Sequence, residues 1–295
     1  MMSTSSLLAR RVLRARKKND VLGAARLFLQ SEELAAEGHA LPLPDDASLF
    51  EPGSLNAVEG AAPIDIRSEY DILAPVSPPL VLGTGLNYHQ HAVECNLQLP
   101  AVPFLAFFKP PGAVQDPEGP IQIPSVITPD KPEVDWEAEL AVIVGRDCKD
   151  LSSDEEASAC ILGYTAANDV SARIWQTDPE LCGGQFNKSK GFDTFLPLGP
   201  AVVLNEAGFD PQSLDLSLKV NGVEKQRSNT SDMIHSVYEV LKFMSQGTTV
   251  RAGTVILTGT PEGVGWFREP REYLTSGDIV EVTLEHVGTL RNIVE

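Results

Sequence analysis

The sequence has few cysteines and no long apolar run, and both shortages narrow the class of protein. Its four cysteines, Cys95, Cys148, Cys160 and Cys182, show no C-x-x-C spacing. A structural zinc site is therefore not expected, and unpaired thiols in a reducing compartment are the simplest interpretation. No uncharged apolar run approaches the ~20 residues of a membrane-spanning helix, so no membrane partner is predicted.

Positive charge is also scarce. The 295 residues contain 23 Lys and Arg against 41 Asp and Glu, which gives a net charge of −18. Nucleic-acid binding needs clustered positive charge, so no nucleic-acid partner is expected for the surface as a whole. A small anionic substrate remains compatible with this composition if a metal ion or a local group of Lys and Arg reverses the field in one cleft.

Two motif absences exclude further classes. No G-x-S-x-G elbow occurs, which argues against a serine hydrolase of the α/β type. The G-x-G of residues 83–85 lacks the third glycine of the dinucleotide fingerprint, which argues against a Rossmann cofactor site.

The chain divides into two predicted units. Residues 1–73 carry Pro and Gly turn signals with little helical periodicity, and they predict a small β-rich domain. The proline-rich segment 74–79 is the expected linker, because closely spaced prolines hold a chain extended. Residues 80–295 form the predicted catalytic domain.

The first 26 residues allow two interpretations. They contain seven Lys and Arg against a single acid, Asp20, which is the composition of a mitochondrial transit segment. They also fit two strands joined at a turn over residues 18–20. A cytoplasmic location is expected, with a mitochondrial one as the alternative.

The segment 134–145, VDWEAELAVIVG, places two carboxylates two residues apart in an apolar run. Glu137 and Glu139 would share one face of a strand, while the intervening side chains face the core. Asp169 follows a later strand-like run and is the natural third ligand of an oxygen-rich site for Mg²⁺ or Mn²⁺. The alternative is an edge strand whose Glu side chains face water.

His91 and Glu94 lie three residues apart in a short predicted helix for which Asn87 is a plausible cap. At this spacing the carboxylate can orient the imidazole, and the pair can deprotonate water. A solvent-facing pair without function is the alternative, and the neighbouring His89 leaves the identity of the base open.

Several further residues are candidate substrate contacts. Arg173, Gln176 and Lys190 can donate hydrogen bonds to a carboxylate or an enolate oxygen, and Thr260 can offer its hydroxyl or backbone. Lys109 ends a hydrophobic strand within residues 104–111. The alternatives are surface salt bridges, a tight turn at residue 260, and a solubilising charge at Lys109.

The rest of the chain reads as scaffold. Capping signals at 152–156 predict a helix of about ten residues ending near Gly163. Asn221-Gly222 predicts a hairpin, and Asp232 can cap a helix that ends at Gly247. Residues 254–265 predict a buried strand entering a glycine-rich turn, and residues 277–294 predict alternating β structure.

Nine segments occur in the order typical of the fumarylacetoacetate hydrolase superfamily: GLNYHQHAVE, FFKPP, DWEAELAVIVG, GYTAANDVSAR, KGFDTFLPLGP, VNG, NTSDMI, ILTGTPEGVG and GDIVEV. The chain from about residue 80 to its end therefore resembles this superfamily. The resemblance implies a mixed α/β, strand-rich fold, a β-sandwich roll with a few short helices, that usually forms a homodimer.

The resemblance also implies roles for single residues. It assigns the divalent ion to Glu137, Glu139 and Asp169, and the catalytic dyad to His91 and Glu94. The remaining matched positions would contact substrate, with Lys190 holding it: Arg173, Gln176, Lys190 and Thr260. No motif lies in residues 1–73.

The expected substrate is a small 2-oxo acid that chelates the ion and passes through an enolate. Such a site serves hydrolysis, decarboxylation or isomerisation, and the superfamily contains all three activities. The complete dyad favours carbon-carbon cleavage, either acylpyruvate hydrolysis or oxaloacetate decarboxylation. Isomerisation or tautomerisation of a 2-oxo acid is the first alternative, and a non-catalytic binding protein is the second.

Overall fold

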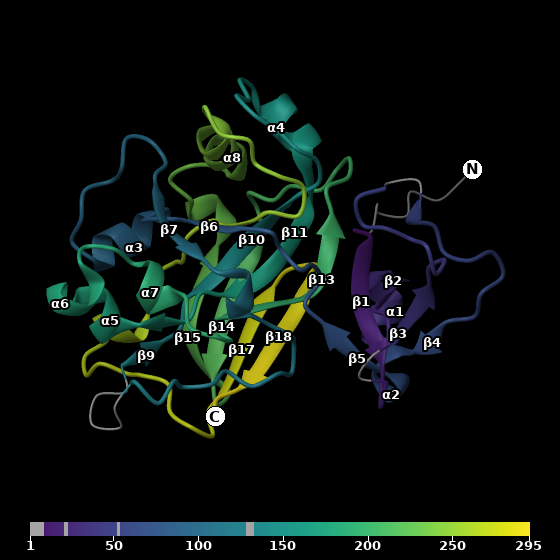
Figure 1. The fold of residues 1–295 in the computed structure, drawn as a ribbon, viewed down its shortest axis with the longest axis horizontal. Coiled ribbons are helices and arrows are strands. Elements are labelled where there is room, and N and C mark those ends of the chain that lie inside the picture. The colour runs from purple at the N-terminus through teal and green to yellow at the C-terminus, as the bar shows by residue number, and fades with distance from the viewer. Residues whose placement is uncertain (1–8, 21–22, 52–53, 128–132) are drawn as a thin grey trace.

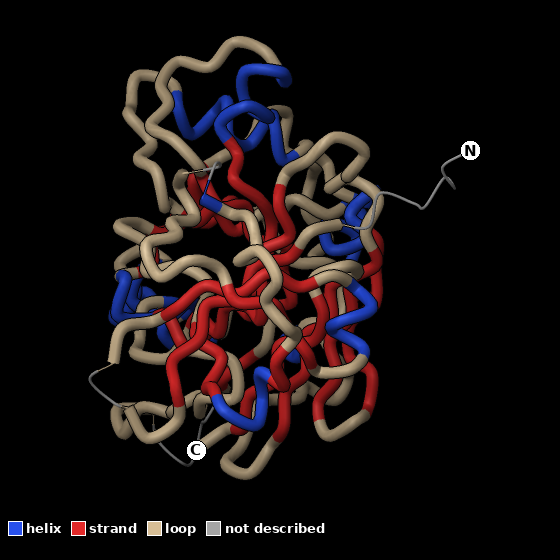
Figure 2. Tube along the Cα trace, turned by 90° about the vertical axis from the view of Figure 1, so that its right-hand side faces the viewer, coloured by secondary structure: helices blue, strands red, loops and turns tan. Residues whose placement is uncertain are grey.

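The computed structural model describes residues 9–20, 23–51, 54–127 and 133–295, and strands dominate this part of the chain (Figure 1). Turning the view by 90° shows short helices around the outside of the strands (Figure 2). The fold is the strand-rich mixed α/β class that the sequence predicts. Of the basic segment 1–26, residues 1–8 and 21–22 lie outside the described residues.

The largest sheet runs in the order β4-β3-β2-β1-β13-β11-β10-β16-β6-β7, with β5 beside β1 and β8 beside β13. Its strands are β1 Arg11–Lys17, β2 Arg26–Gln30, β3 His39–Pro42, β4 Ile64–Asp65, β5 Tyr70–Leu73, β6 Val81–Thr84, β7 Leu105–Lys109, β8 Val114–Gln115, β10 Ala138–Val144, β11 Ile161–Asn168, β13 Leu196–Leu204 and β16 Val255–Leu257.

A second sheet of order β15-β14-β17-β18 packs against β10, β11 and β13 and forms the other layer of the sandwich. Its strands are β14 Asp215–Val220, β15 Val223–Asn229, β17 Ile279–Leu284 and β18 Gly288–Ile293, and a small pair joins β9 Val134–Asp135 to β12 Ser171–Ala172. The hairpin expected at Asn221-Gly222 is confirmed, because β14 and β15 pair across it.

Strand β10 is buried on both faces, between β11 and β16. Leu140 and Val142 pack into the core shared with the second sheet, whereas Ala141 and Ile143 pack into a separate core on the opposite face. The two-residue period of a strand produces this division. The alternative of a solvent-exposed edge strand for this segment is therefore wrong.

The helices are short: α1 Glu32–Ala36, α2 Ile66–Glu69, α3 His89–Glu94, α4 Asp154–Cys160, α5 Arg173–Thr177, α6 Pro179–Cys182, α7 Asn187–Lys190 and α8 Val237–Ser245. The 3₁₀ turns that lie wholly within the described residues are η2 Pro111–Ala113, η3 Thr230–Asp232 and η4 Gly265–Phe267. Among the described residues, no helix has the length and hydropathy needed to cross a bilayer.

Helix α4 is shorter than predicted. It is capped by the side chain of Ser153, as expected, but it ends at Cys160 instead of near Gly163. The chain enters β11 at once, because Ile161 and Tyr164 are buried there and pair with β10. Tertiary pairing outweighs the helical signal at this point.

Two predicted caps are also wrong. Tyr88 is the N-cap of α3, while the buried side chain of Asn87 donates to the carbonyls of His235 and Thr258. Asp232 lies in η3, and Ser236 caps α8 through a capping box with Glu239. The side chain of Asp232 instead accepts the N–H of Gln90, so both expected caps bond to residues that are distant in the sequence.

The basic residues near the N-terminus belong to the fold. Strands β1 and β2 pair antiparallel, as the two-strand interpretation predicts. Arg10 forms an ion pair with Glu206, Arg14 donates to the carbonyl of Ala74, and Lys18 donates to that of Arg67. These three basic side chains therefore have partners within the described residues.

The segment 74–79 is packed against the rest of the chain. Ala74 and Val76 are buried, and the Ala74 N–H donates to Asp116 Oδ1 at 2.6 Å. Strand β1 pairs with β13, so the sheet continues from the N-terminal strands into the part that carries the predicted site.

Gly163 provides a test of the β11–β13 packing. A Cβ at this position would lie 2.1 Å from the carbonyl oxygen of Val203 on β13, so Gly163→Ala must separate the two strands. We expect the free energy of unfolding to fall by about 3 kcal/mol in urea denaturation. The control is Gly112→Ala, whose Cβ would meet its nearest heavy atom at 3.9 Å and should change stability by less than about 0.5 kcal/mol. Equal stability of the two variants would contradict this packing.

Candidate active site

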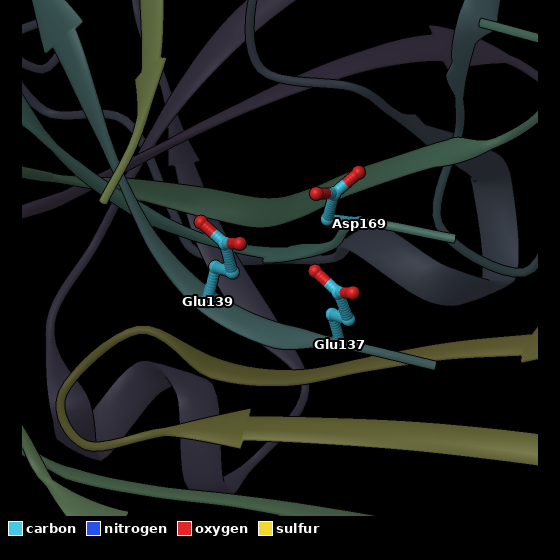
Figure 3. A group of neighbouring side chains, drawn as sticks. All are labelled: Glu137, Glu139 and Asp169. Carbon is cyan, nitrogen blue, oxygen red and sulfur yellow. The ribbon is translucent and has the colours of Figure 1, made fainter. Parts of the chain in front are cut away.

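Three carboxylates meet where β10 begins and β11 ends (Figure 3). The antiparallel register pairs Ala138 with Asn168, so Glu137 and Glu139 on one chain segment face Asp169 on the other. One oxygen from each acid lies within 4.8 Å of the others, and all three residues are buried. The structure thus brings together the three acids predicted to hold a metal.

Gly259 holds one of these acids. Its N–H donates to Glu139 Oε2 at 2.7 Å. Gly259 has a φ of +97°, and a Cβ there would lie 2.9 Å from the Cβ of Asn87. Glycine is therefore required for the backbone to approach the carboxylate in this conformation.

Lys190, at the end of α7, covers the other two acids. Its amine donates to Glu137 Oε2 at 2.9 Å, to Asp169 Oδ2 at 2.5 Å and to Ser171 Oγ at 2.8 Å. Burial opposes the charged amine, but Asp169 and Glu137 outweigh it and raise the pKa of Lys190. The lysine stays charged and reduces the repulsion between the two carboxylates.

The structure does not place Lys109 where a substrate could meet it. Its side chain is fully buried, with the amine 2.7 Å from Asp169 Oδ1 and donating to the carbonyls of Val170, Lys190 and Phe195. Four protein oxygens surround its three N–H groups. Burial lowers the pKa of Lys109 to about 8 although Asp169 opposes the shift. Lys109 contacts Asp169 and is not among the residues that line the cavity described below, and the alternative of a solubilising surface charge is wrong.

Arg173 contacts two acids and Gln176. Its Nη1 lies 2.8 Å from Glu137 Oε1 and donates to Gln176 Oε1 at 2.8 Å, while Nε donates to Asp135 Oδ2 at 2.8 Å. Burial of the guanidinium is outweighed by Asp135 and Glu137, which raise the pKa of Arg173. Gln176 is therefore oriented by an arginine that is itself held in place.

Asp135 is a site residue that the sequence analysis missed. It is completely buried and accepts the N–H groups of Trp136, Gly265 and Trp266 as well as the guanidinium of Arg173. Burial raises the pKa of Asp135, and Arg173 partly offsets the rise. The sequence does indicate this residue. Positions 135, 137 and 139 follow one two-residue period, so their side chains are expected on the same face of an extended segment.

The electrostatic balance of the cluster suits a divalent cation. Four buried carboxylates, those of Asp135, Glu137, Glu139 and Asp169, face three buried cations, Lys109, Lys190 and Arg173. Burial and the nearby Asp169 and Glu137 raise the pKa of Glu139 well above its usual range. Burial would also raise the pKa of Glu137, but Lys190 and Arg173 lower it. The cluster therefore contains one more carboxylate than it has protein cations. Hard carboxylate oxygens with such an excess of negative charge fit Mg²⁺ or Mn²⁺.

The predicted dyad forms on α3. His91 Nδ1 lies 2.8 Å from Glu94 Oε2, and Glu94 Oε1 accepts the N–H of Gly263 at 2.9 Å. Cys95, a second residue that was missed, has its Sγ 3.6 Å from His91 Nε2, and the four-residue helical spacing would have indicated it. The exposed His89 bonds to the Asp232 carbonyl instead, so His91 is the histidine of the site.

Protonated His91 is favoured in this environment. Burial lowers the pKa of its imidazole, but hydrogen bonds with Cys95 and Glu94 outweigh burial and raise the pKa to about 9. The ring therefore carries a proton at neutral pH in the metal-free protein, and a nearby carboxylate, Glu137, adds to the effect.

A cavity of about 340 Å³ joins the dyad to the acids. Seven predicted residues line it: His91, Glu137, Glu139, Arg173, Gln176, Lys190 and Thr260. The Thr260 hydroxyl donates to the Ala138 carbonyl and accepts from Gln226, so it is already engaged. Glu94, Asp169 and Lys109 support the residues that line the cavity.

Comparisons with known proteins identify the family of the chain. The family model described as fumarylacetoacetate (FAA) hydrolase C-terminal matches residues 80–295. A protein of Bos taurus named oxaloacetate tautomerase FAHD2A, mitochondrial, is 42% identical over 231 residues, which are 78% of this chain and 71% of that protein.

Two solved structures share the fold. A fumarylacetoacetate hydrolase from Exiguobacterium antarcticum has a TM-score of 0.80 and 32% identity, over 97% of this chain and 99% of that one. A 2-hydroxyhepta-2,4-diene-1,7-dioate isomerase from Mycobacterium marinum has a TM-score of 0.77 and 34% identity, over 97% and 98% of the two chains. With the family model covering all of the site, the chain belongs to the fumarylacetoacetate hydrolase family.

Proposed function

We propose that the protein is a divalent-metal-dependent enzyme that moves a proton between the enol and keto forms of a small 2-oxo acid. The observation that carries the proposal is the cavity that His91 shares with Glu137 and Glu139. The names of relatives support proton transfer over bond cleavage, since they include an oxaloacetate tautomerase and a dienedioate isomerase.

Mg²⁺ or Mn²⁺ held by Glu137, Glu139 and Asp169 would polarise the 2-oxo group of the substrate and stabilise the negative charge that develops there. Arg173 and Lys190 add positive potential at the cavity wall. Gln176, whose amide oxygen accepts from Arg173, keeps its amide nitrogen as a donor for a substrate oxygen. These residues fix the orientation of the acid before the proton moves.

His91 is the proposed proton donor and acceptor. During ketonisation the enol hydroxyl loses a proton to solvent and C3 gains one from His91, which solvent then reprotonates. Glu94 stabilises the charged ring through Nδ1, and the Gly263 N–H holds Glu94 in place. The reverse sequence returns the enol, and no carbon-carbon bond breaks.

Carbon-carbon cleavage is the second candidate. The fixed His91–Glu94 pair has the arrangement of a general base that could activate water against an acylpyruvate, and decarboxylation of oxaloacetate would need the same polarised 2-oxo group. Water activation requires neutral His91, and in the metal-free protein the pKa of the ring is raised to about 9. A non-catalytic binding role would leave the dyad without a use.

Homodimerisation is proposed from the family resemblance.

The cellular compartment of the protein is also a proposal. The sequence favours the cytoplasm, while the mitochondrial name of the Bos taurus relative supports the mitochondrial alternative.

The reaction is tested with oxaloacetate and acetylpyruvate in the presence of Mg²⁺. We expect faster ketonisation, followed by enol absorbance, without release of pyruvate. Pyruvate with acetate would identify a hydrolase, and pyruvate with carbon dioxide would identify a decarboxylase. Either result overturns the tautomerase proposal in favour of cleavage.

Metal binding is tested apart from turnover. Calorimetric titration of chelator-treated protein with Mn²⁺ should show one site, which Glu139→Gln should weaken by about tenfold or more because a carboxylate ligand is lost. Chelation should also abolish activity. The control is Glu51→Gln, an exposed residue, which should bind Mn²⁺ normally. Unaltered Mn²⁺ affinity in Glu139→Gln would contradict the ligand assignment.

The dyad is tested with His91→Gln and Glu94→Gln. Each should lower kcat by roughly 100-fold or more, the usual scale of an acid-base residue, while Mn²⁺ affinity is retained. His89→Gln, a change at the exposed neighbouring histidine, serves as the control and should keep normal kcat. Loss of Mn²⁺ binding in the two dyad variants would show that they are ligands instead of catalysts.

The same variants test the charge of His91. In metal-free protein the His91 imidazole resonance should titrate near pH 9 by NMR. Glu94→Gln should lower that midpoint, because it removes a carboxylate that stabilises the protonated ring. An unchanged midpoint would exclude Glu94 as a cause of the shift.

A further inference from the structure

Arg271 stacks on a side chain that lines the active-site cavity. The guanidinium carbon lies 3.7 Å from the centroid of the Trp266 ring. Trp266 lines the cavity of about 340 Å³, and so does its neighbour Phe267. The Phe267 ring lies edge to face with the ring of His91, with the two centroids 6.0 Å apart. A cation is therefore held one aromatic side chain away from the interior of the cavity.

Trp266 is itself anchored to the buried charge cluster. Its N–H donates to Asp135 Oδ2 at 2.9 Å, and the N–H of Gly265 donates to Asp135 Oδ1 at 2.7 Å. A guanidinium that stacks on a ring uses its face, so the N–H groups at its edge can still donate to an anion. Arg271 is therefore held in a defined place with donors available for a ligand.

No acid neutralises Arg271 within the part of the chain that the structure describes. The next residue, Glu272, contacts Lys225 and lies 3.6 Å from Arg268 instead. Burial is the largest effect on the neighbouring Tyr273 and raises the pKa of its hydroxyl, although Arg271 opposes the shift. This tyrosine stays neutral near pH 7, so the positive charge of the arginine is left for an anion from outside the chain.

The basic side chains inside the cavity are already engaged. Among the described residues that line it, Arg173 and Lys190 each contact Glu137, and His91 contacts Glu94. A second carboxylate at the mouth of the cavity would remain partly in water, so it would not have to be buried. The stacked arginine could add a charge-assisted hydrogen bond to such a group.

The position of Arg271 also limits which acids can reach it. Trp266 lines the cavity, whereas Arg271 lies behind it and does not. In oxaloacetate a single methylene separates the second carboxylate from the 2-oxo carbon. With the 2-oxo group at Glu137 and Glu139, that carboxylate stays inside the cavity, and a longer chain is needed to reach the arginine.

We propose that Arg271 is a specificity-determining residue that binds the far carboxylate of a 2-oxo diacid longer than oxaloacetate. This inference rests on the proposed function, because it places the 2-oxo end of the substrate at Glu137, Glu139 and Asp169. The planar guanidinium would hold the far carboxylate through two parallel N–H groups, and Trp266 would keep the guanidinium in place.

The test compares succinylpyruvate with butanoylpyruvate, which has a terminal methyl group where succinylpyruvate has a carboxylate. The value of kcat/KM is measured with Mg²⁺ for whichever reaction each compound undergoes. We expect the unmodified protein to prefer succinylpyruvate by about threefold to tenfold, the scale of one partly exposed charge-assisted contact.

Variants of Arg271 test the contact itself. Arg271→Gln should bring the ratio of the two kcat/KM values close to one, through a higher KM for succinylpyruvate, while butanoylpyruvate is turned over as before. Arg271→Lys should keep only part of the preference, because the charge remains but the planar fork is lost. The control is Arg251→Gln, which removes the same charge from an arginine paired with Asp147 and should keep the full preference.

The outcomes separate the two proposals. If the unmodified protein acts on both compounds without preferring succinylpyruvate, the inference is overturned while the proposed function stands. The same holds if Arg271→Gln keeps the preference, or if it slows both compounds equally, which would indicate a purely structural role. If the unmodified protein acts on neither compound nor on oxaloacetate with Mg²⁺ present, the proposed function fails and the inference fails with it.

Discussion

The burial of four carboxylates at one strand junction is the constraint on which the site depends. Isolated carboxylates in such a position would take up protons, so each must be faced by a charge or a hydrogen-bond donor. Lys109, Lys190 and Arg173 supply three charges, and the N–H of Gly259 supports Glu139. Segments far apart in the chain, β7, α5, α7 and the turn after β16, are brought together because each delivers one of these partners.

The sequence was informative wherever the deciding geometry is local. The two-residue period of a strand places Glu137 and Glu139 together, and the three-residue spacing on a helix places His91 beside Glu94. The hairpin at Asn221-Gly222 follows from the same kind of short-range rule. Asp169 is a different case, since its place opposite Glu137 depends on how β10 and β11 pair, and it was proposed from its chemistry and its position after a strand.

The sequence did not predict features that depend on contacts between residues far apart in the chain. Lys109 is a charge at the end of a strand, and only the packing of residues 170, 190 and 195 around it makes it a buried partner of Asp169. Helix α4 ends earlier than predicted for the same reason. Strands β10 and β13 pair with the residues that would otherwise extend the helix. The two-residue period indicates that Asp135 lies on the same face as Glu137, but its ion pair with Arg173 and its hydrogen bonds from the turn at 265–266 depend on two other segments.

The pairing of β1 with β13 affects how readily neighbouring molecules could associate through the edge of the sheet. β13 contacts β11 on one side, and Arg11 and Val12 of β1 pair with Val203 and Val202 on the other. A chain beginning at residue 80, where the family model starts, would present that part of β13 as a free edge beside buried valines. Open edges of this kind pair with strands of neighbouring molecules. The N-terminal strands, which carry none of the site residues, therefore cover an edge of the sheet at which such pairing would start.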